Sequence, residues 1–221
     1  MVMVKAGTTS SDNGSITLDS DIEMGKYEVT QAEFAAVMGF NPSHFSGGNK
    51  PVEMVTWYDA VMYCNKLSEA EGLAKYYNIT NITYYGTDGA SNINAATVTE
   101  NSNANGYRLP TETEWEYAAR GGKDGNNTTY AGSDNIDEVA WYYDNSGNQT
   151  YPVGEKQANE LGIYDMSGSV IEWTNTPSGS ARIRRGGSWS SSGKTCEVDY
   201  GVCSSPNSWD SVLGFRLTKT N

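Results

Sequence analysis

The chain of 221 residues has one histidine, His44, and few basic side chains. A site built from several imidazoles is therefore excluded, and a Ser-His-Asp triad would have to include His44, which lies in the polar segment NPSHFSGG. The chain has only 15 Lys and Arg residues but 27 Asp and Glu residues, which gives a net charge of −12. This charge argues against nucleic acid or an anionic lipid surface as the main partner.

Long apolar runs are also missing. No stretch approaches the roughly 20 apolar residues of a membrane-spanning helix, and the opening segment MVMVKAGTTSSD has no apolar signal core. We therefore expect either a cytosolic protein or the mature form of an exported protein whose leader is absent from this sequence. Charged residues make up 19% of the chain, and Asn, Ser, Thr and Gly supply the remaining polarity, as is common on exported bacterial proteins.

The three cysteines permit few pairings. Cys64 lies in a helical apolar pattern and is most simply a buried small hydrophobe. Cys196 and Cys203 lie close together in a polar segment, where they could pair or both remain free. Because the number is odd, at least one thiol is unpaired in a monomer.

Three helices are predicted by capping boxes, in which a threonine caps the helix and an acidic side chain three residues later returns the hydrogen bond. The pairs are Thr30 with Glu33, Thr56 with Asp59, and Thr111 with Glu114. We expect the first helix to end near Met38, the second at Gly72 and the third at Gly121-Gly122.

Beyond Gly122 the sequence shows no helical signal, only short apolar runs between Gly, Asn, Asp and Ser. We expect short strands or compact loops at 139–143, 151–153, 162–166, 170–174, 182–185 and 214–218. The alternating segment Tyr76–Tyr85 predicts a hairpin arm, and 86–106 predicts a solvated stretch, so that 76–106 is a polar insertion. The fold class is α+β, and six tryptophans compensate for the modest aliphatic content.

Seven segments together resemble the formylglycine-generating enzyme (sulfatase-modifying factor) family, a branch of the C-type lectin fold. They are GKYEVTQAEF from Gly25, FNPSHF from Phe40, PVEMVTWYDAVMYCNKLS from Pro51, GYRLPTETEWEYAARGG from Gly106, YPVGEKQANELGIYDMSGSVIEWT from Tyr151, RGGSW from Arg185 and GFRL from Gly214. Their order and spacing match from about Met1 to Leu217. The resemblance implies one C-type-lectin-like domain over 1–221, with few helices and much irregular loop.

Glu172 stands between the apolar residues Ile171 and Trp173. A buried carboxylate is costly unless it is paired, hydrogen-bonded or metal-bound, so we expect such a partner. The resemblance implies a structural calcium site of the form Gly-Asn-x-x-Glu in many relatives. Ser169 replaces the Asn here, which removes a carbonyl ligand, and we expect no firmly bound calcium.

The enzymes of the family use a copper-binding cysteine pair shortly after RGGS, as the resemblance implies. In this sequence Ser191 holds the first cysteine position and Cys196 the second. A hydroxyl does not replace a thiolate for Cu(I), so we expect no enzyme, no metal and no cofactor. The sulfoxide synthases of this fold need a histidine triad, which one His44 cannot supply. The remaining enzymatic alternative is a formylglycine-generating-type copper oxidase or another thiol-dependent enzyme that uses Cys196 with Cys203.

The segment from Ser190 to Val212 places large side chains among serines between two family motifs. Aromatic anchors with small polar neighbours are typical of adaptable binding surfaces, although a surface loop in which Trp209 covers the scaffold is the simpler alternative. The chain also resembles the C-type-lectin variable proteins of diversity-generating retroelements, whose variable positions lie between RGGSW and GFR. The candidate variable region is therefore 185–217. Most of its non-motif residues can be reached from an Asn codon by adenine changes, but Lys194 and Trp209 cannot.

This second resemblance implies a non-catalytic receptor or adhesin that binds a protein or glycan on another cell or surface. It also implies display on the bacterial cell surface by a lipid anchor carried on a missing leader. We expect Tyr200 and Trp209 to be the anchors of the binding surface. The predicted ligand-binding residues are Ser190, Ser191, Ser192, Lys194, Tyr200, Val202, Cys203, Ser204, Ser205, Ser208, Trp209, Asp210, Ser211 and Val212. The sequence leaves the ligand and the oligomeric state open.

Overall fold

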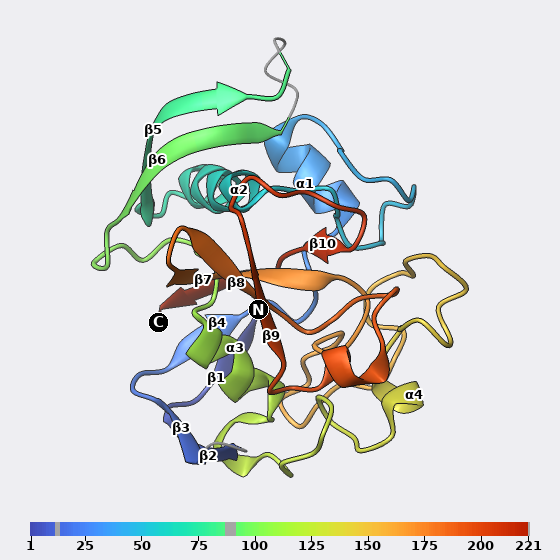
Figure 1. Ribbon diagram of the computed structural model, residues 1–221. Coiled ribbons are helices and arrows are strands. Elements are labelled where there is room, and N and C mark those ends of the chain that lie inside the picture. Colours follow the sequence, from blue (N-terminus) through green and yellow to red (C-terminus); the bar gives the residue numbers. More distant parts are fainter. Residues whose placement is uncertain (12–13, 87–91, 221) are drawn as a thin grey trace.

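The computed structural model describes residues 1–11, 14–86 and 92–220. A four-stranded sheet of order β10-β7-β8-β9 crosses the middle of the molecule (Figure 1). Its strands are β7 (Ile171–Ser178), β8 (Ala181–Arg185), β9 (Gly201–Ser204) and β10 (Leu213–Gly214). β10 runs parallel to β7, whereas β8 and β9 continue the sheet antiparallel. The segment 190–212 therefore leaves this sheet after β8 and returns to it at β9 and β10.

A second sheet, of order β1-β4-β11, joins the two ends of the described chain. Its strands are β1 (Val2–Val4), β4 (Ile22–Met24) and β11 (Thr218–Thr220), and β4 is antiparallel to both neighbours. A hairpin of β2 (Gly7–Ser11) and β3 (Gly14–Leu18) lies at the lower end of Figure 1. The last strand after the GFRL motif is thus fixed beside the first strands.

The three helices predicted from capping boxes are confirmed. They are α1 (Gln31–Met38), α2 (Trp57–Ala70) and α3 (Glu112–Ala119), and in each the capping threonine and its acidic partner exchange both hydrogen bonds. At the end of α1, Gly39 adopts the left-handed conformation with φ 87°. This conformation is accessible to glycine at little cost, which is why the helix ends there.

The prediction that helical structure ends after Gly122 is wrong. The structure has a short helix α4 (Ile136–Val139) and two 3₁₀ turns, η1 (Gly122–Asp124) and η2 (Gly193–Cys196). α4 is capped by the side chain of Asn135, which accepts a hydrogen bond from the Asp137 backbone. These elements are at most four residues long, too short to produce a hydrophobic period in the sequence.

Of the segments expected to be short strands or compact loops, some are strands and others are loops. Residues 170–174 and 182–185 contribute to β7 and β8, and 214–218 spans the end of β10 and the start of β11. Residues 151–153 and 162–166 form compact loops, and 139–143 contains the end of α4.

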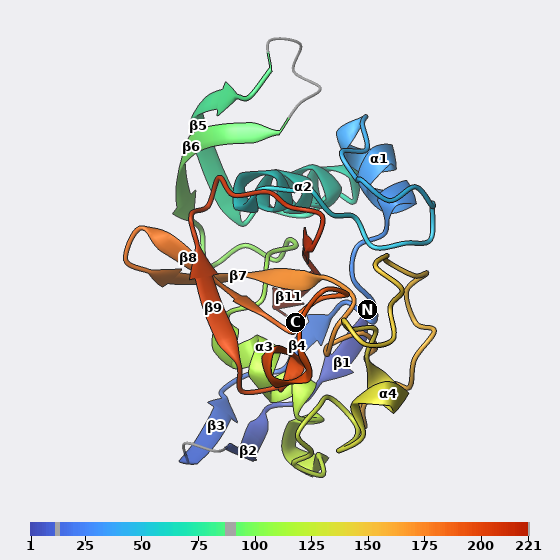
Figure 2. The same ribbon diagram turned by 45° about the vertical axis from the view of Figure 1, so that its right-hand side comes forward.

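The hairpin arm predicted at Tyr76–Tyr85 is confirmed as β5 (Tyr77–Tyr84), which pairs antiparallel with β6 (Ile93–Glu100). Most of the stretch that was predicted to be solvated, 86–106, is exposed or half-buried where the structure describes it, but β6 lies within it and Ile93 is only 1% exposed. The Ile93 backbone N–H donates to Asp59 of α2 at 2.8 Å, so the hairpin lies against that helix (Figure 2). Residues 87–91 of this stretch are outside the described residues.

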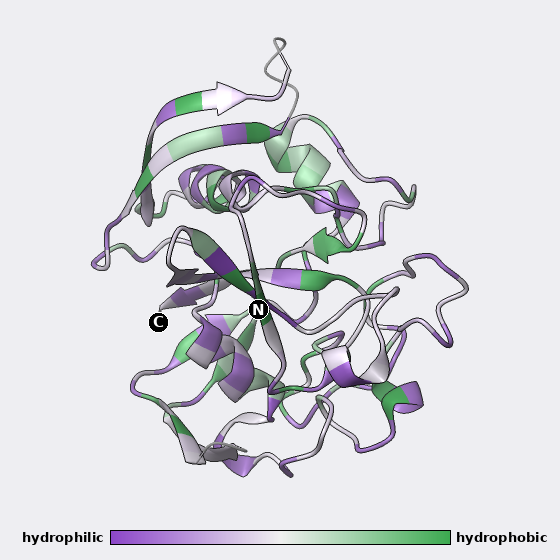
Figure 3. Cartoon of the chain, viewed as in Figure 1, coloured by the Kyte–Doolittle hydropathy of each residue, from purple (hydrophilic) through white to green (hydrophobic). Residues whose placement is uncertain are grey.

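Three buried tryptophans organise the core on both sides of the central sheet. Trp57 and Trp173 lie in the cluster between α1, α2 and this sheet, and Trp115 lies in the cluster next to β1 and β4. Each indole N–H has an acceptor: the Thr174 carbonyl for Trp57, the Val55 carbonyl for Trp173 and Glu172 for Trp115. Figure 3 shows that hydropathy changes sharply near the end of the chain: β10 is hydrophobic, whereas the segment between β9 and β10 is pale to hydrophilic.

Candidate ligand-binding surface

Glu172 and Arg216 form a buried ion pair at the centre of the buried scaffold of helices and strands, which we call the frame. Both carboxylate oxygens accept hydrogen bonds from the guanidinium, with N–O distances of 2.6–2.9 Å, and the Trp115 indole N–H donates at 2.7 Å. Burial lowers the pKa of Arg216, but Glu172 through its charge and hydrogen bonds, together with Glu28 and Asp165, raises it by more, so the guanidinium stays charged. The prediction that Glu172 has a partner is confirmed. This pair ties the GFRL motif to β7.

The position of the family's calcium motif does not fit a calcium ion. Glu172 already gives both oxygens to the Arg216 cation. The Ser169 hydroxyl donates to Glu28 at 2.9 Å, and the Val170 N–H donates to the other oxygen of Glu28 at 3.0 Å. Over the ranges 1–11, 14–86 and 92–220, no group of three or more His, Cys, Asp or Glu side chains is arranged to hold a metal ion. The absence of calcium remains a prediction.

The cysteines do not fit a Cu(I) site either. Cys196 is buried beside Val139 and Ala140, and burial raises the pKa of its thiol to about 12. A thiolate, not a thiol, is the metal ligand. The Ser191 hydroxyl shares a hydrogen bond with that of Ser188. Cys203 is exposed on β9, and all three cysteines are free. The structure therefore gives no disulfide between Cys196 and Cys203.

Strand β9 presents the predicted residues on two opposite faces. Val202 is the register partner of Arg184, and Cys203 is the partner of Ile183. Because side chains alternate along a strand and directly opposite pairs share a face, Val202 and Ser204 lie on the face of Arg184. Cys203 points to the other face, away from these two.

The segment between β9 and β10 is held by its backbone. The Trp57 N–H donates to the Pro206 carbonyl at 3.0 Å, and the Met54 N–H donates to the Asp210 carbonyl at 2.9 Å. These bonds leave the side chains outside: every predicted ligand-binding residue is exposed or half-buried, and Trp209 is 46% exposed.

Trp209 borders an open pocket of about 490 Å³, which we call the Trp209 pocket. Its lining residues are Tyr85, Arg184, Ser204, Asn207, Ser208, Trp209, Asp210 and Leu213. The Tyr85 ring lies 6.0 Å from that of Trp209, and its hydroxyl donates to the Asn207 carbonyl at 2.9 Å. Tyr85 and Arg184 were not among the predicted site residues. The exposed aromatic at the end of an alternating hairpin arm was the signal for Tyr85.

The other predicted residues are more widely spread than expected. Tyr200 precedes β9 and Trp209 follows it, and the strand alone spans about 10 Å. Lys194 pairs with Glu197 at 2.6 Å and lines a different hollow with Asn127 and Thr129, which shares no lining residue with the Trp209 pocket. Tyr200 and Trp209 therefore do not lie together in one compact site.

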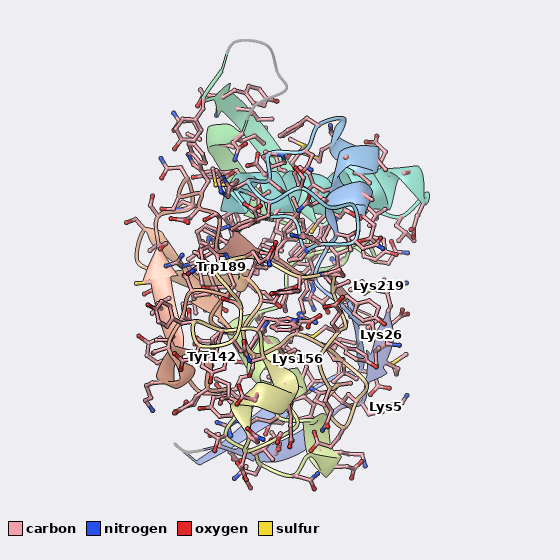
Figure 4. The ribbon with its side chains drawn as sticks, turned by 90° about the vertical axis from the view of Figure 1, so that its right-hand side faces the viewer. Lys5, Lys26, Tyr142, Lys156, Trp189 and Lys219 are labelled. Atoms are coloured by element: carbon pink, nitrogen blue, oxygen red, sulfur yellow. The ribbon has the colours of Figure 1, made fainter. Side chains whose placement is uncertain are left out.

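Residues 190–192 connect to the Trp209 side through Trp189. The Trp189 indole N–H donates to the Ser211 carbonyl at 2.9 Å, and its ring meets that of Phe45 edge to face at 5.4 Å. The Ser191 carbonyl accepts from the Tyr143 N–H at 3.0 Å, so this stretch lies beside the loop after α4. Trp189 and Tyr142 accordingly appear on the same side of the molecule in Figure 4.

These features agree with the comparisons with known proteins. The chain belongs to the family of the Sulfatase-modifying factor enzyme 1-like domain, which it matches over residues 1–221. The predicted α+β, C-type lectin fold of the formylglycine-generating-enzyme subtype is confirmed.

Three particular relatives are informative. The structure of Treponema denticola variable protein 1 superposes with a TM-score of 0.85 at 33% identity, covering 100% of this chain and 95% of that one. CarF gives 0.79 at 31% identity, with coverage of 100% and 97%. The Chaperone protein LppX of Paenibacillus barcinonensis is 46% identical over 98% of this chain and 86% of its own length. The predicted resemblance to the C-type-lectin variable proteins of diversity-generating retroelements is thus confirmed as to class, and Treponema variable protein A is one member of that class which the sequence suggests. In the part of the chain that the structure describes, no helix is both long and apolar enough to cross a membrane.

Proposed function

We propose that this protein is a non-catalytic, receptor- or adhesin-type binder whose surface between RGGSW and GFRL, within 185–217, is diversified by a retroelement. The observation that carries the proposal is the contrast along this region. Every residue predicted to vary is accessible to solvent, whereas Arg185, Gly187, Phe215 and Arg216 in the flanking motifs are buried. The likeness to Treponema denticola variable protein 1 supports it.

Such a contrast lets side chains change without loss of the fold. The loop between β9 and β10 is held by backbone hydrogen bonds to residues 54 and 57, which do not depend on the loop's own side chains. Surface substitutions away from buried contacts usually change stability by less than about 0.5 kcal/mol. The scaffold therefore tolerates many versions of the same surface.

The proposed partner is a protein or a glycan on another cell or surface, and the protein is proposed to be displayed on a bacterial surface by a lipid anchor. The name of the LppX relative, a chaperone protein at 46% identity, supports a polypeptide as the ligand. The net charge of −12 disfavours nucleic acid.

The neighbouring DNA tests the diversification. We expect a near-copy of the 3′ end of the gene beside a reverse transcriptase gene, differing from it only at adenines. The differences should fall in codons of exposed residues such as Ser204, Ser208 and Asp210, and the codons of Trp173 and Arg216 serve as the matched control. Absence of a near-copy, or differences that fall equally in the two sets, would contradict the proposal.

A second measurement tests the absence of catalysis. A copper-reconstituted sample given a cysteine-containing sulfatase peptide should form no aldehyde, because Cys196 is buried with a raised pKa and Ser191 carries no thiol. A copper-loaded formylglycine-generating enzyme is the positive control. Turnover by this chain would restore the oxidase alternative.

A further inference from the structure

We infer that the Trp209 pocket binds a carboxylate of an extended peptide, which pairs with the guanidinium of Arg184 beside the rings of Tyr85 and Trp209. This inference rests on the proposed function and names the ligand chemistry of its surface. It starts from Arg184, for whose side chain the described residues provide no ion pair.

Arg184 is half-buried and differs from the fully buried arginines of the described chain. Arg108, Arg185 and Arg216 each pair with a glutamate. For the Arg184 side chain, the part of the chain that the structure describes offers neither an ion pair nor a hydrogen bond, and its Nε is buried without an acceptor. Its guanidinium lies 5.9 Å from the Trp173 ring. A buried donor without an acceptor is costly, and a carboxylate in the pocket would compensate by pairing with the accessible terminal nitrogens of the same guanidinium.

The charge around Arg184 is only partly balanced. Burial lowers the pKa of Arg184, and the nearby negative charge of Asp210 opposes that shift. Asp210 is exposed and accepts a hydrogen bond from the Ser211 hydroxyl at 3.3 Å. It does not contact the guanidinium directly, so an incoming carboxylate would meet the cation first. Asp210 would weaken that carboxylate's binding by like-charge repulsion.

The walls of the pocket suit an apolar group next to the carboxylate. Tyr85 is 49% and Trp209 is 46% exposed, and their rings meet at 60°. The Tyr85 hydroxyl is fixed by the Asn207 carbonyl, which holds this ring in place. Exposed, rigid aromatic rings of this kind contribute contact area at low entropic cost.

An extended peptide fits the strand that borders the pocket. β9 is the last strand of the central sheet, with β8 as its neighbour on one side. An edge strand can pair with an added strand, so that the backbone gives affinity and alternate side chains enter pockets. Ser204 belongs both to β9 and to the pocket lining, which places such a side-chain pocket at the end of the edge. This argument favours a peptide over a glycan.

The test compares two hexapeptides, acetyl-Thr-Val-Asp-Phe-Val-Thr-amide and the same peptide with Asn in place of Asp. Binding to the full chain is followed by the arginine Nε–H and indole N–H resonances of the ¹⁵N-labelled protein. We expect the Asp peptide to bind about tenfold more tightly, the value of one charged hydrogen bond, and to shift the Arg184 and Trp209 resonances.

Three variants sharpen the test. Arg184→Gln should remove the preference for Asp over Asn, whereas Asp210→Asn should increase binding of the Asp peptide severalfold. Arg182→Gln is the matched control, because Arg182 lies on the same strand and face but donates to the Asn175 carbonyl at 2.7 Å. It should keep the preference. If Arg184→Gln fails to fold, the Asp210→Asn result and the wild-type resonances still decide.

Several outcomes would overturn the inference: equal binding of the two peptides, a preference that survives Arg184→Gln, or an equal loss in Arg182→Gln. Tighter binding of 3′-sialyllactose than of the Asp peptide would assign the carboxylate to a glycan and overturn the peptide. The proposed function fails separately. If the DNA carries the near-copy but the protein does not prefer the Asp peptide, diversification still holds and only the carboxylate ligand is wrong. If the protein prefers the Asp peptide but the DNA carries no near-copy, the ligand still holds and the diversification is wrong.

Discussion

Two regions of this molecule treat an arginine in opposite ways: Arg216 is buried and Arg184 is half-buried. At the centre of the frame, Arg216 has its charge fully met by Glu172, and the pair is sealed by Trp115. At the Trp209 pocket, Arg184 has no such acceptor in the described structure and faces an open hollow. The comparison shows that buried polar contacts fix the motifs at the two ends of the segment 190–212. Where this segment meets solvent, the described structure leaves polar groups accessible to a ligand.

The turn just before the segment 190–212 shows the same change from restricted to unrestricted positions. Gly187 has a φ of 71°, and a side-chain Cβ added there would lie 2.6 Å from the Cys196 sulfur. A larger residue therefore cannot enter without moving the buried Cys196. Just beyond it, Ser190 and Ser192 are exposed. Within a few residues the chain passes from a position that allows one residue type to positions that allow many.

The largest effect should come from breaking the frame. Glu172→Ala leaves Arg216 charged and buried without its partner, which typically costs about 3–5 kcal/mol. Urea unfolding followed by tryptophan fluorescence measures the change in the free energy of unfolding. Glu197→Ala is the matched control, because its partner Lys194 is a surface side chain and exposed pairs contribute about 0–1 kcal/mol. Similar losses in the two variants would remove the distinction between frame and surface.

The pH dependence of stability should reveal the same frame. Burial raises the pKa of Asp165, which lies near Arg216 and Glu172, to about 6, although the Gly154 N–H opposes this shift. Between about pH 4 and 6 the folded state then binds this proton more tightly than the unfolded state. The free energy of unfolding should therefore gain about 2 kcal/mol from this group as the pH falls from 7 to 4.

Asp165→Asn should remove most of that gain when urea unfolding is measured at several pH values. The separate contributions of Asp59, whose pKa burial also raises to about 6, and of Glu28 and Glu53, whose pKa values burial raises as well, should remain. Asp134→Asn is the control, because hydrogen bonds from Thr129 lower the pKa of Asp134, and its effect has the opposite sign and lies at lower pH. An unchanged slope in Asp165→Asn would show that Asp165 is not the titrating group.

Local signals in the sequence predicted the frame well. Each capping box is complete within four residues, so it could be read without the fold, and all three were correct. The need of Glu172 for a partner followed from its apolar neighbours alone. Its partner Arg216 did not, because the two residues are 44 positions apart and meet only through the pairing of β10 with β7.

The pocket was harder to predict because chain segments far apart in the sequence build it. Tyr85 comes from the β5–β6 hairpin and Trp209 from the loop after β9, and no local pattern relates them. The sequence did indicate which segment would be exposed, since serines separate its large side chains. It did not indicate that β9 would divide the segment, so Tyr200 and Trp209 were expected to act together.

Substitution of the exposed aromatics should separate stability from binding. Trp209→Ala should change the free energy of unfolding by less than about 0.5 kcal/mol, yet weaken a ligand that uses the Trp209 pocket by about 2 kcal/mol. Tyr200→Ala should also leave melting nearly unchanged, and should weaken only a partner wide enough to reach both ends of β9. Thermal unfolding and titration calorimetry with the Asp peptide measure the two quantities.

Trp189→Ala is the matched control for Trp209→Ala. Trp189 is half-buried, donates to the Ser211 carbonyl and packs on Phe45, so its loss should lower the melting temperature. A collapse of the fold in Trp209→Ala would instead mean that this ring covers the scaffold, and the binding surface would have to be placed elsewhere.

The smallest effect on stability should come from the thiol at the surface. Cys203 is exposed on β9, whereas Cys64 and Cys196 are buried and burial raises the pKa of both thiols. A thiol reagent at neutral pH should modify one cysteine quickly and the other two only on unfolding, and Cys203→Ser should abolish the fast reaction while changing stability by less than about 0.5 kcal/mol. No fast reaction before reduction would indicate that Cys203 is oxidised. An oxidised Cys203 could carry a small thiol or a second copy of the chain, and only a disulfide with Cys196, shown by peptide mapping, would return the thiol-dependent enzyme to consideration.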